Sequence, residues 1–226
     1  MAESGLFSPE FFRFLRELAR NNNREWFQRN KDRYERSVLE PAVRFVEQVG
    51  PQLKTISASV VADPRPYGGS VSRIYRDTRF SKDKTPYRTA VGIRFKHETA
   101  LSSEDHLPGF VLHLAPGDCW VVAGVWHPAP PALKQIRDAI AAKGSGWGRV
   151  LRAGVVVDGE LAARAPAGYD ASHPFAKDLR RKEFYSWVGV KDADVLRPSL
   201  GPRFLGLCRE LAPLNRFIAD ALHIPW

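Results

Sequence analysis

The sequence has little cysteine and lacks a long hydrophobic run. Its 226 residues include two cysteines, Cys119 and Cys208, which lie far apart and outside any CxxC or Cys/His spacing. We therefore expect two reduced, buried thiols and no disulfide framework. No apolar run approaches the roughly eighteen residues that span a membrane, and the opening MAESGLFSPEFF lacks the regions of a secretory signal. These absences predict a cytoplasmic protein without a membrane span.

Several motifs of well-known enzymes and cofactor sites are absent as well. The sequence contains no GxxxxGKS/T, no GxGxxG after a strand and no GxSxG, which argues against the common nucleotide sites and against an acyl-transfer enzyme. It also contains no HExxH and no paired cysteines, so we expect no metal site. The sequence leaves any cofactor unknown.

Positive charge is abundant. The formal net charge is +9 and the isoelectric point is near 9.8. Such a balance favours polyanionic partners, among them nucleic acid, phosphorylated metabolites or an anionic lipid surface. A basic composition is equally compatible with a protein that has no such partner, so the position of the charge matters more than its sum.

Much of this charge lies in one segment, from Ser70 to Phe95. Between Val71 and Ala90 it contains six cations and two acids. The cations are Arg73, Arg76, Arg79, Lys82, Lys84 and Arg88, and the acids are Asp77 and Asp83. Burying unpaired guanidinium groups costs several kcal/mol each, so this cannot be an ordinary core strand. We expect a strand end and an irregular loop that lead into a strand of about residues 88–96.

This basic segment is the strongest candidate site. Arginine forks bind phosphate or carboxylate bidentately, and lysine adds a point charge. We predict that Arg73, Arg76, Arg79 and Lys84 hold an anion. Asp77 and Tyr87 are candidate proton-transfer groups, and Phe80 is expected to anchor the segment in the core. The alternative for Asp77 is a buried ion network with Arg76 and Arg79 that only supports the fold.

A second candidate is the segment GYDASHPF, residues 168–175. We predict ligand-binding roles for Tyr169 and Asp170 and proton transfer by His173, because His and Asp three residues apart can form an acid–base pair. The alternative is a local turn, in which Asp170 caps the backbone. We expect the basic segment and GYDASHPF to contribute to one cleft.

The spacing of the basic segment also resembles a known family signature. Its pattern is Arg73-x-x-Arg76-Asp77-x-Arg79-Phe80-x-x-x-Lys84-x-x-Tyr87. This pattern resembles that of the DUF2461 family, bacterial and fungal proteins of unknown function. NNNREWFQRNKDRYE, FVLHLAPGDCWVVAGVW and GYDASHPF resemble the same family, in the same order. The resemblance implies a single domain over residues 1–226, and it brings no established activity or catalytic residues.

The elements predict an α+β fold, with N-terminal helices packed on a largely antiparallel sheet. Helices are expected from Ser8-Pro9 to Asn21, from an N-cap at Asn22, and around Pro41 up to Gly50-Pro51. Residues 110–115 and 119–126 predict a hairpin around Pro116-Gly117. Both faces of its second strand are apolar, so we expect a central strand, with helices on one side and a core or pocket on the other. Another hairpin is expected at Asp158-Gly159, and a terminal helix over residues 201–222 that restarts at Pro213.

Three functions remain open from the sequence. The leading hypothesis is an anion-binding cleft, in a possible enzyme that acts on a phosphorylated or acidic small molecule. A nucleic-acid-binding module is the first alternative, because Tyr75, Phe80 and Tyr87 are interleaved with cations. A structural or partner-binding domain is the second. The oligomeric state is unknown.

Overall fold

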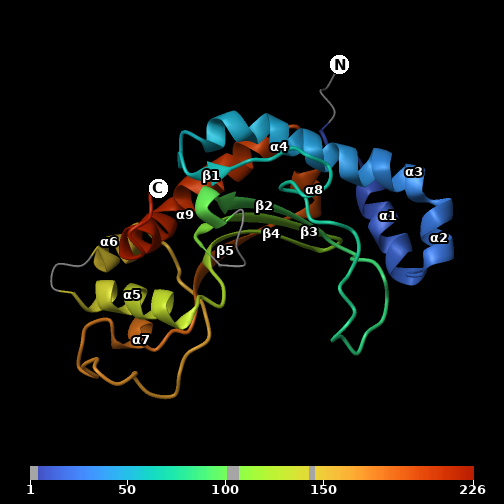
Figure 1. The fold of residues 1–226 in the computed structure, drawn as a ribbon. Coiled ribbons are helices and arrows are strands. Elements are labelled where there is room, and N and C mark those ends of the chain that lie inside the picture. Colours follow the sequence, from blue (N-terminus) through green and yellow to red (C-terminus); the bar gives the residue numbers. More distant parts are fainter. Residues whose placement is uncertain (1–4, 101–106, 143–145) are drawn as a thin grey trace.

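A five-stranded antiparallel sheet organises the protein (Figure 1). A computed structural model describes residues 5–100, 107–142 and 146–226. The strands are β1 (Val60–Val61), β2 (Val91–His97), β3 (Gly109–Ala115), β4 (Asp118–Val125) and β5 (Phe184–Val190), and they pair in sequence order. Ile93 lies opposite Leu112, and Val111 lies opposite Val122, which lies opposite Trp187.

The hairpin of β3 and β4 confirms the prediction. Ala115 pairs with Asp118, so Pro116 and Gly117 form the turn. Gly117 has φ +78°, the left-handed backbone that a type II turn requires after proline. β4 is central, between β3 and β5, as its apolar faces indicated.

The N-terminal helices form as predicted, with a one-residue shift at one cap. Helix α1 (Pro9–Arg20) has proline in its first turn and buries Phe11, Phe14 and Leu18. Helix α2 (Arg24–Arg29) is capped by Asn23, whose side chain accepts a hydrogen bond from the Trp26 N–H, and not by Asn22. Asn22 binds the backbone of the basic segment instead, as described below.

The following helices run through their prolines. Helix α3 (Lys31–Tyr34) continues into a π-helical turn (Glu35–Leu39) and then into α4 (Glu40–Leu53). Pro41 lies in the first turn of α4, directly after the π-helical turn, whose altered hydrogen-bond register accompanies its missing N–H. Helix α4 passes Gly50-Pro51 and ends at Leu53, so the predicted stop was too early.

The C-terminal helix α9 (Leu200–Ala221) is also continuous, and the predicted restart at Pro213 was wrong. Its first half packs into a core with α1, α4 and the sheet, through Phe204 and Cys208. Its second half packs into another core around Trp147, through Phe217 and Ile218. One helix therefore borders both clusters of buried side chains.

Smaller elements complete the chain. They are a 3-10 turn (Glu98–Ala100), α5 (Pro130–Ala141), α6 (Trp147–Arg152), α7 (Ala176–Leu179) and α8 (Asp192–Val195). The predicted hairpin at Asp158-Gly159 does not pair with itself. Asp158 bridges to Tyr185 and Leu161 to Arg181, so this segment runs beside the start of β5.

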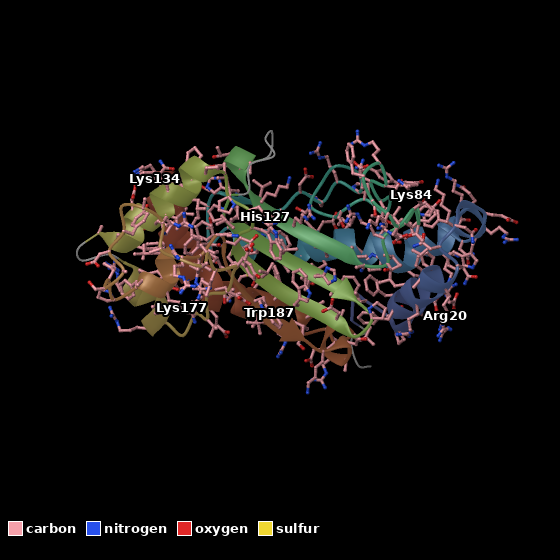
Figure 2. All side chains as sticks on the ribbon, turned by 90° about the horizontal axis from the view of Figure 1, so that it is seen from below. Arg20, Lys84, His127, Lys134, Lys177 and Trp187 are labelled. Atoms are coloured by element: carbon pink, nitrogen blue, oxygen red, sulfur yellow. The ribbon has the colours of Figure 1, made fainter. Side chains whose placement is uncertain are left out.

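The two faces of the sheet differ. Helices α4 and α9 cover one face, whereas Figure 2 shows the strands from the other side without a covering helix. Cys119 and Cys208 are both buried and unpaired, as predicted. Among the described helices, none is both long and apolar enough to cross a membrane. The fold is α+β, as the sequence indicated.

Candidate functional site

The basic segment folds as a hairpin, which we call the basic hairpin (residues 70–94). Its arms pair through bridges of Val71 with Ile93 and of Tyr75 with Tyr87. The Arg88 N–H donates to the Ile74 carbonyl at 2.7 Å, and the Arg94 N–H donates to the Ser70 carbonyl at 2.8 Å. The tip, residues 77–85, is irregular. This matches the predicted strand end and loop, although β2 itself begins three residues later than expected.

Tyr87 fixes the base of the basic hairpin to the helical layer. Its side chain is 2% exposed and stacks on Phe27, with ring centroids 4.1 Å apart. Asn22 holds the Tyr87 backbone on both sides, because its amide donates to the carbonyl at 2.9 Å and its oxygen accepts from the N–H at 3.0 Å. Burial raises the pKa of Tyr87. These contacts describe an anchor, and a role in proton transfer stays a prediction.

The tip of the basic hairpin carries ion pairs at the surface. Arg79 binds Asp77 with an Nη2–Oδ2 distance of 2.7 Å, and Arg76 binds Asp83. The Arg79 side chain lowers the pKa of Asp77 to about 2. Asp77 is 41% exposed, so the alternative of a buried ion network does not describe it. Phe80 is 94% exposed, and the expectation of a core anchor was wrong.

Lys84 is used within the tip. Its ammonium donates to the Thr78 carbonyl at 2.9 Å, which closes the loop on itself. With Arg79 paired to Asp77 and Arg76 paired to Asp83, three of the four predicted anion ligands are therefore engaged in local contacts. The fourth, Arg73, lies nearer the sheet.

Arg73, Arg76 and Arg94 lie near enough to Arg88 for their positive charges to act on it, and we call these four residues the arginine cluster. The pKa of Arg88 is lowered, first by partial burial and then by the positive charge of Arg94, Arg73 and Arg76. Of these four arginines, only Arg76 has a carboxylate partner among the ion pairs of the described residues. Arg88 and Arg94 were not among the ligands predicted from the sequence. The alternation of β2, in which Arg94 points away from the core between Ile93 and Phe95, was the signal for Arg94.

The segment GYDASHPF lies at the other end of the molecule, beside α5 and α7 (Figures 1 and 2). The Tyr169 hydroxyl donates to Asp138 at 2.8 Å. Asp170 accepts from the Ser172 N–H, and His173 accepts from the Phe175 N–H. The two predicted segments do not share a cleft. The contacts of Asp170 fit the local-turn alternative, and functional roles for Tyr169, Asp170 and His173 stay predictions.

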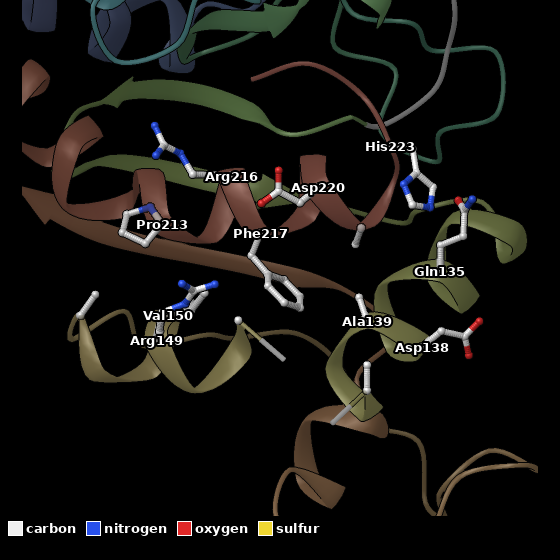
Figure 3. A pocket seen from close by; sticks show the side chains of 14 residues that line it. Gln135, Asp138, Ala139, Arg149, Val150, Pro213, Arg216, Phe217, Asp220 and His223 are labelled. Carbon is white, nitrogen blue, oxygen red and sulfur yellow. The ribbon is translucent and has the colours of Figure 1, made fainter. Parts of the chain in front are cut away.

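One hollow, of about 870 Å³, lies between α5, α6 and α9 (Figure 3). Its walls carry charges of both signs, with Arg149 and Arg216 against Asp138 and Asp220. The hydrogen bond of Tyr169 to Asp138 places GYDASHPF next to this hollow. The balanced charges give it no preference for an anion.

A second hollow, of about 640 Å³, lies on the uncovered side of the sheet. Arg94 and Lys96 line it together with the aromatic side chains of Trp120, Trp126 and Tyr185. Its described lining residues include no carboxylate. Because Arg94 also belongs to the arginine cluster, this hollow and the cluster are adjacent.

The hollow is part of a larger surface, which we call the open face. Its members are Arg94, Lys96, His113, Trp120, Trp126, Tyr185 and Trp187. Trp126 stacks on Tyr185 with centroids 4.8 Å apart, and His113 stacks on Trp120 at 4.4 Å. Trp126 and Trp187 are 52% and 55% exposed. The sequence predicted two apolar faces for β4, but it did not reveal which one the helices leave open.

A strained histidine borders the open face. His127 follows Trp126 and has φ +47°, which is uncommon for a residue with a side chain. Its Nδ1 lies 2.6 Å from a carboxylate oxygen of Glu183, which is buried directly before β5. Within residues 5–100, 107–142 and 146–226, no group of three or more His, Cys, Asp or Glu is placed to hold a metal ion.

Comparison with known proteins gives one match. The family described as conserved hypothetical protein (DUF2461) matches residues 10–217, nearly the whole chain. No curated protein and no solved structure matches. The family description names no activity. The chain belongs to the DUF2461 family.

Proposed function

We propose that the arginine cluster binds an anion that carries phosphate. The observation that carries this proposal is the proximity of four arginines on the two paired arms of the basic hairpin, where the Arg88 N–H donates to the Ile74 carbonyl and the Arg76 N–H donates to the Pro86 carbonyl. These arginines have one carboxylate among their described ion-pair partners. The pKa of Arg88 is lowered first by partial burial and then by the positive charge of Arg94, Arg73 and Arg76, which repels its own charge. A bound anion would relieve that repulsion.

Phosphate fits the cluster better than a single carboxylate does. A guanidinium group donates two parallel hydrogen bonds to an oxyanion, and a phosphate offers three or more oxygens to several forks at once. Three of the four arginines are exposed, so a ligand can reach them from solvent. This assigns binding to Arg73, Arg76, Arg88 and Arg94, with Arg79 and Lys84 at the rim.

The proposal concerns binding and assigns no reaction. Asp77 is held as an ion pair with a pKa of about 2, so it is a weak proton acceptor at neutral pH. Tyr87 is buried at the base, and His173 belongs to the segment that leads into α7, at the other end of the molecule. An acid–base mechanism around the anion would therefore need groups other than these three.

Calorimetric titration with pyrophosphate tests the proposal. We expect binding to wild type that weakens at least tenfold in Arg88→Gln/Arg94→Gln, because each lost fork removes a charge-assisted contact worth about 1.5–3 kcal/mol. Lys134→Gln/Lys177→Gln is the matched control, because it removes two exposed positive charges, from α5 and α7, at the opposite end of the molecule from Lys84 in Figure 2. Equal affinities in all three proteins, or no binding to any, would overturn the proposal.

A further inference from the structure

We propose that the open face binds single-stranded nucleic acid. The bases would stack on its aromatic side chains, and the phosphate backbone would run to the arginine cluster. This inference rests on the proposed function and names the class of anion. It commits to a flexible, unpaired strand, because the features described below fit exposed bases better than a duplex or a lone phosphate.

The first feature is the exposure of the aromatic rings. A sheet that faces water normally presents polar side chains on that side. Here Trp126 and Trp187 expose more than half of their surface, and Trp120 and Tyr185 are partly exposed beside them. Rings on an open sheet surface are stacking platforms for unpaired bases in RNA-binding sheets, where two or three bases are held.

The second feature is the position of the cations relative to the rings. Arg94 lies opposite Val111, which lies opposite Val122 and then Trp187. With about 4.8 Å between strands, Arg94 and Trp187 are roughly 14 Å apart across the sheet. A nucleic-acid strand that crosses this surface would meet aromatic rings, on which its bases can stack, at β4 and β5. It would meet positive charge at β2. The charge complements a phosphodiester backbone along one edge of the face.

The third feature is space between the rings. Gly189 lies beside Trp187 on β5 and pairs with Trp120, and no heavy atom lies within 4 Å of a side-chain carbon placed on it. Packing therefore does not explain the glycine. Open space next to an exposed tryptophan suits a planar group, whereas a duplex hides the faces of its bases within its own stack.

The test uses fluorescence anisotropy with labelled oligonucleotides of about 12 nucleotides, which is within the site sizes of single-strand binders. The probes are poly-uridine, poly-thymidine and a duplex of the same length. We expect single strands to bind more tightly than the duplex, and the affinity to fall as salt rises. Trp187→Ala should weaken single-strand binding by about 5- to 100-fold, because one stacked base is lost.

A pair of glycine variants separates the open face from net charge. Gly189→Glu puts a carboxylate on the open face, and Gly206→Glu puts the same charge on α9, on the covered side of the sheet. Neither position has a heavy atom within 4 Å of the added carbon, so both variants should fold. We expect Gly189→Glu to abolish oligonucleotide binding and Gly206→Glu to leave it within twofold of wild type.

The outcomes distinguish this inference from the proposed function. If pyrophosphate binds through Arg88 and Arg94 but single strands bind no better than the duplex and Trp187→Ala has no effect, the inference fails and the proposed function stands. If nothing with phosphate binds, both fail. Equal losses in Gly189→Glu and Gly206→Glu would also overturn the inference, because charge alone would then explain binding.

Discussion

At the scale of single residues, Tyr87 shows how a residue of the basic motif can serve the fold. Its ring stacks on Phe27 and its backbone is held by Asn22, so the hairpin and helix α2 are joined at one point. The sequence suggested proton transfer because a tyrosine stood among cations. The contact with Phe27, sixty residues earlier in the chain, carried no local signal.

Two substitutions at Tyr87 separate anchoring from chemistry. Tyr87→Phe keeps the stacked ring, so we expect the free energy of unfolding and pyrophosphate affinity to stay at wild-type values. Tyr87→Ala should lower the free energy of unfolding by about 3–5 kcal/mol, because it leaves a cavity at the base of the hairpin. Urea unfolding and calorimetry measure the two effects. A loss of pyrophosphate affinity in Tyr87→Phe would show that the hydroxyl takes part in binding.

At the scale of elements, the end of β4 is held to the start of β5 by His127 and Glu183. The chain turns at His127 with φ +47°, a conformation that costs a non-glycine residue roughly 1–2 kcal/mol. The imidazole Nδ1 lies 2.6 Å from the buried Glu183 carboxylate, so the two side chains are in contact at this corner.

The strain at His127 can be measured with a matched pair. His127→Gly and His127→Ala both remove the contact with Glu183, but only alanine keeps the steric cost of the left-handed backbone. We expect both to be less stable than wild type, with His127→Ala about 1 kcal/mol below His127→Gly in urea unfolding. Equal stabilities would contradict a left-handed backbone at this position.

Elements with local signals were predictable from the sequence. The proline and apolar spacing of α1 and the Pro116-Gly117 turn were sufficient to place those elements. The open face was not predictable in this way. Arg94 and Trp187 lie more than ninety residues apart, and they share a surface only because β2, β3, β4 and β5 pair in order. Both faces of β4 are apolar, so periodicity could not tell which one the helices cover.

The same limit explains the mistaken cleft. The basic segment and GYDASHPF both contain polar residues in loops, which is where sites usually lie. Their separation depends on the sheet, which places one beside α2 and the other beside α5 and α7. The helix boundaries predicted at proline were wrong for a different reason, because α4 and α9 contain Pro51 and Pro213 within continuous helices.

At the scale of the whole molecule, stability should depend on pH near neutrality through His113. Burial against Trp120 lowers the pKa of His113 below its ordinary value of 6.5. As the pH falls through about 6.5, the unfolded chain takes up a proton before the folded protein does. The free energy of unfolding should therefore be highest above this pH and decrease below it.

Urea unfolding at several pH values around 6.5 checks this expectation. His113→Gln should flatten the decrease, because glutamine does not titrate. His223→Asn is the control, since it removes an exposed imidazole near the C-terminus and should keep the slope of wild type. A slope in His113→Gln equal to that of wild type would assign the dependence to other groups.

Helix α9 links the unfolding of the two hydrophobic cores. It is 22 residues long, about 33 Å, and its two halves complete two different cores. Unfolding of either core removes packing contacts from α9, which also contributes to the other core. We therefore expect both cores to unfold together in a single cooperative thermal transition. In hydrogen–deuterium exchange, the amides in the middle of α9, near Leu211 and Leu214, are then expected to be among the last to exchange, opening only when the entire chain does.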